Sequence, residues 1–294
     1  MRKKTNRKKR NKKQKKPVPI LRIVRHFGWH PGRVASEILE WTEILAIAGL
    51  LAFLVIAFIT VRMSVPTGSM IPTIDPKDSF YVDRVSYYFR APKPGDVVVF
   101  WHVEEVLVNK VIDGSPAQRV GVEVGGRIVS INQEPVFSAA GGDEIVGSLA
   151  PGQQILLGFS GTARLDLGPK ELGVNSLAAL GVVTRERRLR YVKRLIAIGG
   201  QTVKISGGDV SVDGEKLVGE RFDRYYYSND PRMRYGVNET LVPEGKLFVL
   251  GDNSSNSWDS RYWGFVDEDA FIGEPYFRVW PLSRFGPMNG YFHF

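Results

Sequence analysis

The hydrophobic pattern divides the chain into two unlike parts. Residues 44–61 are uncharged and almost wholly apolar, without the polar face that a helix in a globular domain usually shows. With its flanks, a helix of this length spans a hydrocarbon core of ~30 Å. The run is too long and too far from the N-terminus for a cleaved signal peptide. The pattern therefore predicts a single N-terminal transmembrane helix over residues 43–62.

After residue 62 the pattern changes to that of short strands. Runs rich in valine, isoleucine and aromatic residues alternate with glycine, proline and aspartate turns, as in "DVVVFW", "LRYVKRLIAI", "QTVKISGGDVSVDGEKLV" and "KLFVLGD". The segment "VDGEK" predicts the turn of a hairpin, and no long amphipathic helix follows the apolar run. The predicted fold class is mainly β, with an antiparallel β domain after the helix.

The positive charge of the chain is concentrated before the apolar run. Residues 1–40 carry a formal charge of +12 and the rest of the chain −3. Because basic residues mark the cytoplasmic side of a membrane helix, residues 1–42 are expected to form a basic cytoplasmic tail. The domain after about Arg62 is then expected outside the cytoplasm, on a single-pass protein of the inner or plasma membrane. Anionic membrane lipid accounts for the charge of the tail, so lipid is an expected partner and nucleic acid is not.

The candidate nucleophile is a serine, because the chain contains no cysteine. The same absence excludes disulfides and thiolate zinc sites, and neither a metal nor another cofactor is expected. Ser69 lies in "SVPTGSMIPTI", where prolines restrict the backbone and Gly68 permits the close approach of another segment. This stretch predicts a rigidly held hydroxyl, although a linker leaving a membrane has a similar composition.

A serine nucleophile needs a base, and two side chains qualify. Of the four histidines only His102 has a suitable location. The alternative is a lysine whose pKa is lowered by apolar surroundings, and Lys193 in "LRYVKRLIAIGG" fits that role. Because side chains alternate along a strand, only one of the adjacent cations Lys193 and Arg194 is expected to face inward. The residues alone leave the base open.

Four segments together resemble a known family. "PTGSMIPTI", "PKPGDVVVF", "YVKRLIAIGG" and "GDNSSNSWDSRYWGFV" occur in the order seen in bacterial type I signal peptidases, the S26-like leader peptidases. These membrane-bound enzymes use a Ser/Lys dyad to remove signal peptides from exported preproteins. The resemblance covers the anchor through Phe100 and about residues 187–294, including "EPYFRVWPLSRFG" as the closing strand. It implies a catalytic domain in two parts, residues 63–103 and 187–294, with preproteins as substrates.

The resemblance also implies roles for individual residues. Ser69 would be the nucleophile and Lys193 the general base. The backbone N–H of Ser69 and the hydroxyl of Thr67 would form the oxyanion hole, and Ser257 would orient the lysine. The remaining residues would line pockets for small residues before the scissile bond (Val65, Tyr191 and Val192) or support the site structurally (Asp252, Asp259 and Arg261).

Residues 104–186 are far more than a connection between two strands needs. The stretch "EVLVNKVIDGSPAQRVGVEVGGRIVSINQEPV" resembles the PDZ domains of bacterial proteases. A PDZ-like α+β insertion is therefore expected, with a short helix in "GSPAQRVGV", a hairpin in "GGRIVSINQEPV" and a strand in "LAPGQQILLGF". PDZ domains bind extended peptides by strand addition. The glycine–apolar loop that usually serves this purpose is not evident in "FWHVEEVLV", so a peptide or protein ligand of the insertion stays open.

Two other classes of protein share parts of this pattern. An autocleaving repressor-type Ser/Lys protease has the same catalytic logic, but the apolar run argues against it. A non-catalytic, membrane-anchored PDZ scaffold would be expected to have lost Ser69 or Lys193, and both are present.

Overall fold

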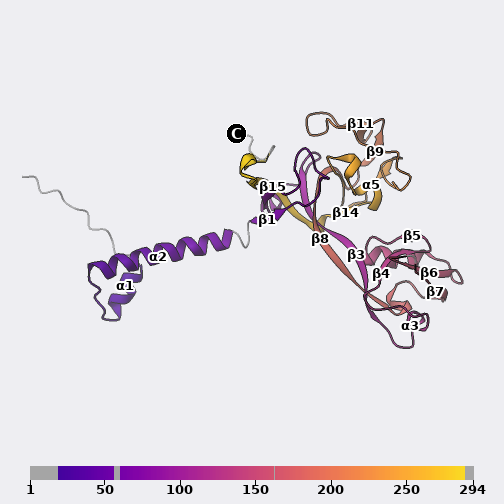
Figure 1. Ribbon diagram of the computed structural model, residues 1–294, viewed down its shortest axis with the longest axis horizontal. Helices are drawn as coiled ribbons and strands as arrows, with labels where there is room; N and C mark the ends of the chain where they lie inside the picture. Colours follow the sequence, from indigo (N-terminus) through magenta and orange to yellow (C-terminus); the bar gives the residue numbers. More distant parts are fainter. Residues whose placement is uncertain (1–18, 56–59, 162, 289–294) are drawn as a thin grey trace, which may run out of the picture. The chain divides into compact units, whose positions relative to one another are not determined.

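The computed structural model describes residues 19–55, 60–161 and 163–288. The chain forms two units, Met1–Thr60 and Val61–Phe294. The first unit contains helices α1 (Pro19–His26) and α2 (Arg33–Leu54) (Figure 1). The predicted tail of residues 1–42 thus includes one helix and the start of another, while its basic cluster, residues 2–16, lies outside the described residues.

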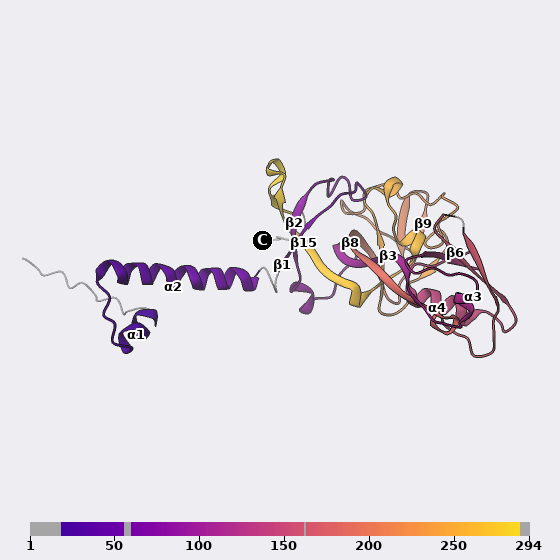
Figure 2. The same ribbon diagram turned by 60° about the horizontal axis from the view of Figure 1, so that its bottom comes forward.

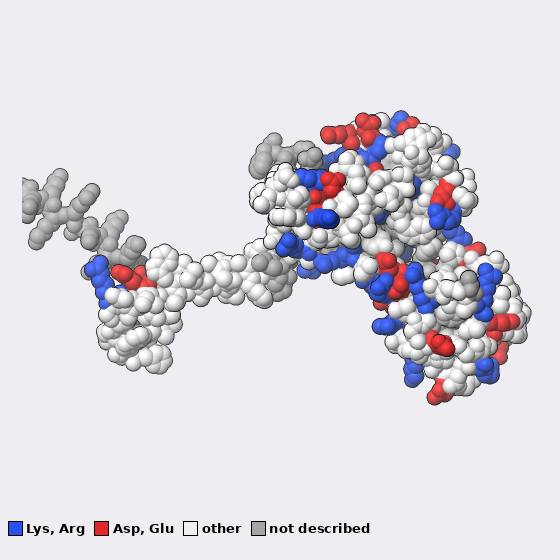
Figure 3. Space-filling view, viewed as in Figure 1, with Lys and Arg blue, Asp and Glu red and all other residues white. Residues whose placement is uncertain are grey.

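Helix α2 contains most of the predicted membrane span. It has no buried residue, and its part from residue 44 onward carries no charged side chain (Figure 3). Within residues 19–55, 60–161 and 163–288, no helix combines the length and the apolarity needed to cross a membrane. Residues 56–59 of the predicted span lie outside the described residues, and residues 60–62 belong to strand β1 (Thr60–Ser64) rather than to a helix.

The second unit is built on a twelve-stranded sheet, and the strand pairs of its described residues are antiparallel, so the prediction of a mainly antiparallel β fold is confirmed. Its main path runs β1-β2-β15-β3-β4-β6-β7, and β8 joins β3 to β13. Besides β1 and the strands β4 to β7, whose bounds are given below, the sheet contains β2 (Ser79–Asp83), β3 (Val97–Val111), β8 (Val182–Ile198), β13 (Lys246–Leu250), β14 (Val266–Asp267), β15 (Phe271–Trp280) and β16 (Gly286–Pro287).

Strands β3 and β8 form a long two-stranded ribbon. Their pairing extends from Val97↔Arg194 to Val111↔Val182, with register shifts at Val103/Glu105 and Val108/Lys110. Both ribbon diagrams show the pair running from beside β15 to beside β6 (Figures 1 and 2). The two ends of the predicted insertion therefore lie side by side.

The segment of residues 104–186, here called the insert, has a hydrophobic core of its own. All buried residues of this core lie between Val106 and Val182. The predicted helix is α3, the predicted hairpin is β4–β5, and the predicted later strand is β6. The elements of the insert are α3 (Pro116–Arg119), β4 (Arg127–Ile131), β5 (Glu134–Pro135), α4 (Ala139–Ser148), β6 (Gln154–Phe159) and β7 (Arg164–Pro169).

Helix α4 was not predicted, because its sequence "AAGGDEIVGS" contains three glycines, which disfavour a helix interior. Two features compensate. The Ser138 side chain caps the helix by accepting a hydrogen bond from the Gly141 N–H at 2.9 Å. Gly142 packs so closely that a Cβ there would lie 2.9 Å from Leu177. Tertiary packing therefore overrides the local preference.

A second, four-stranded sheet has the order β11-β10-β9-β12. Its strands are β9 (Thr202–Ser206), β10 (Asp209–Val212), β11 (Glu215–Lys216) and β12 (Thr240–Leu241). The pair Val212↔Glu215 closes the hairpin that "VDGEK" predicted. This sheet packs with residues of β8 and β13 in one core cluster.

Candidate active site

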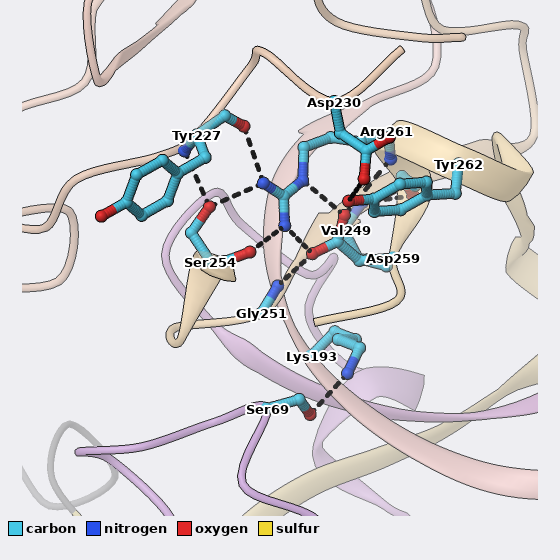
Figure 4. Close-up of polar contacts among 11 residues, drawn as sticks. Ser69, Lys193, Tyr227, Asp230, Val249, Gly251, Ser254, Asp259, Arg261 and Tyr262 are labelled. Carbon is cyan, nitrogen blue, oxygen red and sulfur yellow. Dashed lines mark hydrogen bonds and ion pairs between the residues drawn. The ribbon is translucent and has the colours of Figure 1, made fainter. Parts of the chain in front are cut away.

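Two segments far apart in sequence bring a serine and a lysine together. Ser69 lies in a turn after β1, and Lys193 lies in β8. A hydrogen bond of 2.6 Å joins Lys193 Nζ and Ser69 Oγ (Figure 4). Both residues are buried, with exposed fractions of 4% and 5%. This is the geometry that a nucleophile and its base require.

The surroundings of Lys193 favour its neutral form. Burial lowers the pKa of Lys193 to about 8, and the charge of Arg261 acts in the same direction, although Asp259 and Asp252 oppose it. A lysine amine with a pKa near the working pH can accept a proton from a hydroxyl.

The other candidate base, His102, lies in strand β3 and does not contact Ser69 through a hydrogen bond among the described residues. Its ring packs against Tyr191 and Trp263, with ring centroids 4.5 and 4.6 Å away. Burial and the nearby charge of Lys193 lower the pKa of His102 to about 4. Among the described residues, Lys193 and not His102 is hydrogen-bonded to Ser69.

The turn that carries Ser69 is held by Asn253, a residue that the sequence analysis did not single out. The Asn253 side-chain amide donates to the Gly68 carbonyl at 3.0 Å, and its backbone N–H donates to the Ser69 carbonyl at 2.9 Å. The neighbouring Met70 is fully buried. These contacts hold the backbone on both sides of the hydroxyl, so Asn253 positions the candidate nucleophile.

Gly251 permits the loop after β13 to approach this turn. A Cβ at Gly251 would lie 2.1 Å from Ser257 Oγ and 2.6 Å from the Ser69 carbonyl oxygen, so no larger residue fits without a shift. Ser257 itself is buried. Within the described part of the chain its hydroxyl has no hydrogen-bond partner, so the expected bond from Ser257 to Lys193 is not formed in this structure.

The two expected oxyanion donors are the hydroxyl of Thr67 and the backbone N–H of Ser69. Thr67 is exposed. Neither its hydroxyl nor the backbone N–H of Ser69 donates to an acceptor among the described residues.

The three expected pocket residues lie in two different environments. Val65 and Val192 are buried in one cluster with Met63 and Met70. Tyr191 lies on the Lys193 face, with Lys193 Nζ 5.7 Å from its ring centroid. Val65 and Val192 therefore lie in the core on the face of β8 opposite Lys193.

A buried ion pair supports the loop that follows β13. Arg261 and Asp259 both have an exposed fraction of 0%. The Arg261 guanidinium donates to Asp259 at 2.8 Å, to the Tyr227 carbonyl at 2.7 Å and to the Ser254 hydroxyl at 2.6 Å (Figure 4). The Asp259 carboxylate also caps α5 (Ser260–Trp263) and accepts the Gly251 N–H at 3.0 Å. This network ties the position of Gly251 to the short helix.

The burial of Arg194 shows that one expectation from the sequence was wrong. Alternation predicted that only one of Lys193 and Arg194 would face inward, yet both have an exposed fraction of 4%. Arg194 donates to the Asp252 carboxylate at 2.6 and 2.7 Å, and Arg224 lies 3.0 Å from the same group. Both faces of β8 are covered at this point, and the second face holds a buried counter-charge. Asp252 is therefore the counter-charge of the buried Arg194 and of the partly exposed Arg224.

Comparison with known proteins identifies the family of this chain. The family model "Signal peptidase, peptidase S26" matches residues 38–147 and 169–280. The chain is 28% identical over 252 residues to "Probable signal peptidase I-1" of Synechocystis sp., covering 86% of this chain and 87% of the relative. It is 37% identical over 103 residues to "Signal peptidase I" of Bacillus caldolyticus, covering 32% of this chain and 56% of the relative. A crystal structure of a signal peptidase I from Enterococcus faecalis, 33% identical, matches 29% of this chain and 81% of that chain with a TM-score of 0.23. Because the family model covers well over half of the sequence, the chain belongs to the signal peptidase family, peptidase S26.

Proposed function

We propose that Ser69 and Lys193 are the nucleophile and the general base with which this chain cleaves signal peptides from exported preproteins. The chain is a serine peptidase, a hydrolase of the signal peptidase family. The observation that supports these two roles is the buried hydrogen bond of 2.6 Å between Lys193 Nζ and Ser69 Oγ.

In the first half of the reaction, neutral Lys193 accepts the proton of Ser69 as Oγ attacks the carbonyl carbon of the scissile bond. The Ser69 N–H and the Thr67 hydroxyl then donate to the oxyanion, and each such donor is worth about 3 kcal/mol of barrier. Lys193 returns its proton to the leaving amine, so that an acyl-enzyme and a free mature chain result. Water, deprotonated by Lys193, hydrolyses the ester in the second half.

The proposed function predicts cleavage whose rate rises with pH. We expect detergent-solubilised protein to cut a preprotein with an Ala-X-Ala site once, after the second alanine, as mass spectrometry of the products would show. Because only deprotonated Lys193 acts as a base, and because its pKa is about 8, kcat/KM should rise through about pH 8. A profile that peaks below about pH 5 would exclude a lysine base.

We further propose that the apolar segment that begins at residue 43 and ends before β1 anchors the chain in the inner or plasma membrane. The described part of this segment presents apolar side chains on its surface: Ile44, Leu45, Ile47, Leu50, Leu51 and Phe53 are each more than half exposed. Lipid would cover such side chains. With the basic residues 2–16 in the cytoplasm, the catalytic domain lies outside it, where exported preproteins emerge.

The anchor predicts a definite pattern of protease accessibility. In spheroplasts treated with trypsin, sites among residues 2–16 should be protected, and exposed sites such as Lys77 and Arg119 should be cut. Detergent lysis should make the first group accessible as well, which controls for sites that are merely resistant. Protection of the domain and cleavage of the tail in intact spheroplasts would contradict the proposed topology.

We also propose that the insert is a PDZ-like module. Its separate core, its short helix α3 and its β4–β5 hairpin support this assignment.

A further inference from the structure

A cavity of about 460 Å³ lies beside Arg194, the neighbour of Lys193 that points to the other face of β8. Neither Ser69 nor Lys193 lines it, so it is separate from the proposed catalytic pair. Three carboxyl groups and five guanidinium groups line the cavity. The arginines come from β8, from the loop between β11 and β12, and from the C-terminal part of the domain: Arg194, Arg221, Arg224, Arg278 and Arg284.

One buried carboxylate serves two of these arginines. Asp252 lies 2.6 Å from Arg194 and 3.0 Å from Arg224. Each guanidinium group carries five N–H donors, so the shared carboxylate fixes both groups without using all of their donors. One negative charge thus compensates two positive charges on this wall of the cavity.

Arg278 is incompletely compensated as well. The buried Asp78 lies 3.0 Å from Arg278 and 3.1 Å from Arg284, so it is also shared. The Arg278 Nη2 group donates to the Thr73 carbonyl at 2.9 Å, but its buried Nε–H makes no hydrogen bond within the described part of the chain. Burial and the charge of Arg284 lower the pKa of Arg278 below its ordinary value, although Asp78 and Asp75 oppose this. An anion in the cavity would stabilise this cation.

The arginine of the outer wall has the fewest contacts. The Arg221 side chain is 42% exposed, and its guanidinium lies 3.6 Å from Asp96, beyond hydrogen-bond distance. No acceptor among the described residues takes a hydrogen bond from the Arg221 side chain. Its donors are therefore free for a ligand.

The carboxyl groups that line the cavity compete weakly at neutral pH. Arg90 pairs with both Asp96 and Glu274. Burial and the charge of Asp96 raise the pKa of Glu274 to about 7, while the charge of Arg90, a hydrogen bond from Tyr87 and the charge of Arg221 act in the opposite direction. Near neutral pH Glu274 thus carries only part of its negative charge.

We propose that this cavity binds a phosphate group. Guanidinium groups bind phosphate oxygens through pairs of parallel N–H donors, and the buried carboxylates hold these guanidinium groups in place before the ligand arrives. The cavity has room for the organic group that bears the phosphate.

Two sources supply this chemistry, a soluble phosphate ester and the headgroup of a phospholipid. The second is relevant because the segment that carries Arg278 and Arg284 also has three apolar side chains that are more than half exposed: Trp280, Leu282 and Phe285.

The test uses the full chain in dodecyl maltoside micelles, at an ionic strength kept constant with potassium chloride so that screening does not change. Calorimetric titration with glycerol 3-phosphate should show one saturable site per chain. At ten times the half-saturating concentration Tm should rise by about 3–6 °C, because the ligand binds the folded chain. Arg221→Gln should weaken binding at least about tenfold, as expected for the loss of charge-assisted hydrogen bonds. Arg278→Lys keeps a cation beside Asp78 but loses the planar fork, so it should also weaken binding.

Arg127→Gln is the matched control. The Arg127 side chain is 45% exposed and pairs with one carboxylate, Glu105, but it does not line this cavity. Its replacement should leave the affinity for glycerol 3-phosphate unchanged. Binding that survives both Arg221→Gln and Arg278→Lys would overturn the site.

Mixed micelles distinguish the two sources. Phosphatidylglycerol is compared with a diacylglycerol that has the same acyl chains and no phosphate. A rise in Tm with phosphatidylglycerol alone, lost in Arg221→Gln, would identify a lipid headgroup as the ligand. Saturation by glycerol 3-phosphate without an effect of phosphatidylglycerol would identify a soluble ester. If neither compound binds, the proposal fails.

Sulfate, whose charge is constant between about pH 6 and pH 8, tests the contribution of Glu274. Protonation of Glu274 removes a negative charge from the cavity, so sulfate should bind several-fold more tightly at about pH 6 than at about pH 8. Glu274→Gln keeps an acceptor for the Tyr87 hydroxyl, which donates to Glu274 at 3.1 Å in the wild type. In this variant the affinity at the higher pH should reach that at the lower pH. An unchanged pH dependence would exclude Glu274 as its source.

Discussion

Replacing Lys193 with methionine should abolish preprotein cleavage and at the same time stabilise the folded protein at neutral pH. The loss of activity follows from the loss of the base, which is worth at least about 10²–10⁴-fold in rate. Lys193→Arg should be inactive as well, because a guanidinium does not lose its proton in a protein. Ser69→Ala should be inactive for a different reason, the absence of a nucleophile. Product formation from a preprotein, followed by gel electrophoresis, measures all three.

The gain in stability follows from the lowered pKa. The folded protein holds the Lys193 proton with a pKa of about 8, against 10.5 as the ordinary value. Between these values the unfolded chain binds more protons, so wild-type stability rises as pH increases through this window. Below about pH 8 the buried cation costs about 3 kcal/mol, which Lys193→Met removes. The difference in the free energy of unfolding between variant and wild type should therefore be largest at neutral pH and small above about pH 10.

Lys216→Met is a suitable control for this stability measurement, because the Lys216 side chain is 57% exposed. The effect of Lys216→Met on the free energy of unfolding should be small both at neutral pH and above about pH 10. Activity retained by Lys193→Met would remove Lys193 from the mechanism. A variant that is inactive but equally destabilised at all pH values would indicate a packing defect rather than the loss of a buried base.

Asp259→Ala should destabilise the protein by about 3–5 kcal/mol, because it leaves the Arg261 charge buried without a partner. Arg261 and Asp259 are both completely buried. The substitution also removes the acceptor of the Gly251 N–H and the cap of α5. Denaturant unfolding followed by tryptophan fluorescence measures the change.

The ion pair of Asp209 and Lys216 is the control. Its atoms are 2.7 Å apart, about as close as those of the buried pair, but its side chains are 54% and 57% exposed. Asp209→Ala should change the free energy of unfolding by less than about 1 kcal/mol. The double variant Asp259→Leu/Arg261→Met should recover much of the stability, since no charge is then left unpaired. Equal effects of Asp259→Ala and Asp209→Ala would show that burial does not decide the strength of this pair.

Local patterns predicted much of the β structure. The hairpin at "VDGEK" follows from its turn residues, and the strands β3, β8 and β13 follow from runs of valine, isoleucine and leucine. The extent of these strands was underestimated, because β3 and β8 continue beyond their apolar parts into charged segments. There the ladder of hydrogen bonds and ion pairs, such as Arg187–Glu105, sustains the pairing.

The supports of the site depend on contacts that no local pattern contains. Arg194 looked like a surface residue, and its burial requires Asp252, which is 58 positions away in the sequence. No local sequence signal distinguishes Asn253 from other loop residues, and its role follows only from its contact with the turn of Ser69. A glycine that directly follows an apolar strand indicates a narrow space beside Gly251. The sequence does not predict that Ser257 and Ser69 border this space.

The long pairing of β3 with β8 has a mechanical consequence. The strand that carries Lys193 is also one of the two struts that hold the insert, and the regular ladder between them is first interrupted at Val103/Glu105. A ribbon of two strands resists extension and bends where its pairing is irregular. The insert is also tied to the catalytic domain at a second place, because Phe137 packs against the core cluster that contains Phe100 and Trp263. A force applied to the insert would therefore reach the catalytic domain both along the strand that carries Lys193 and through the contact of Phe137.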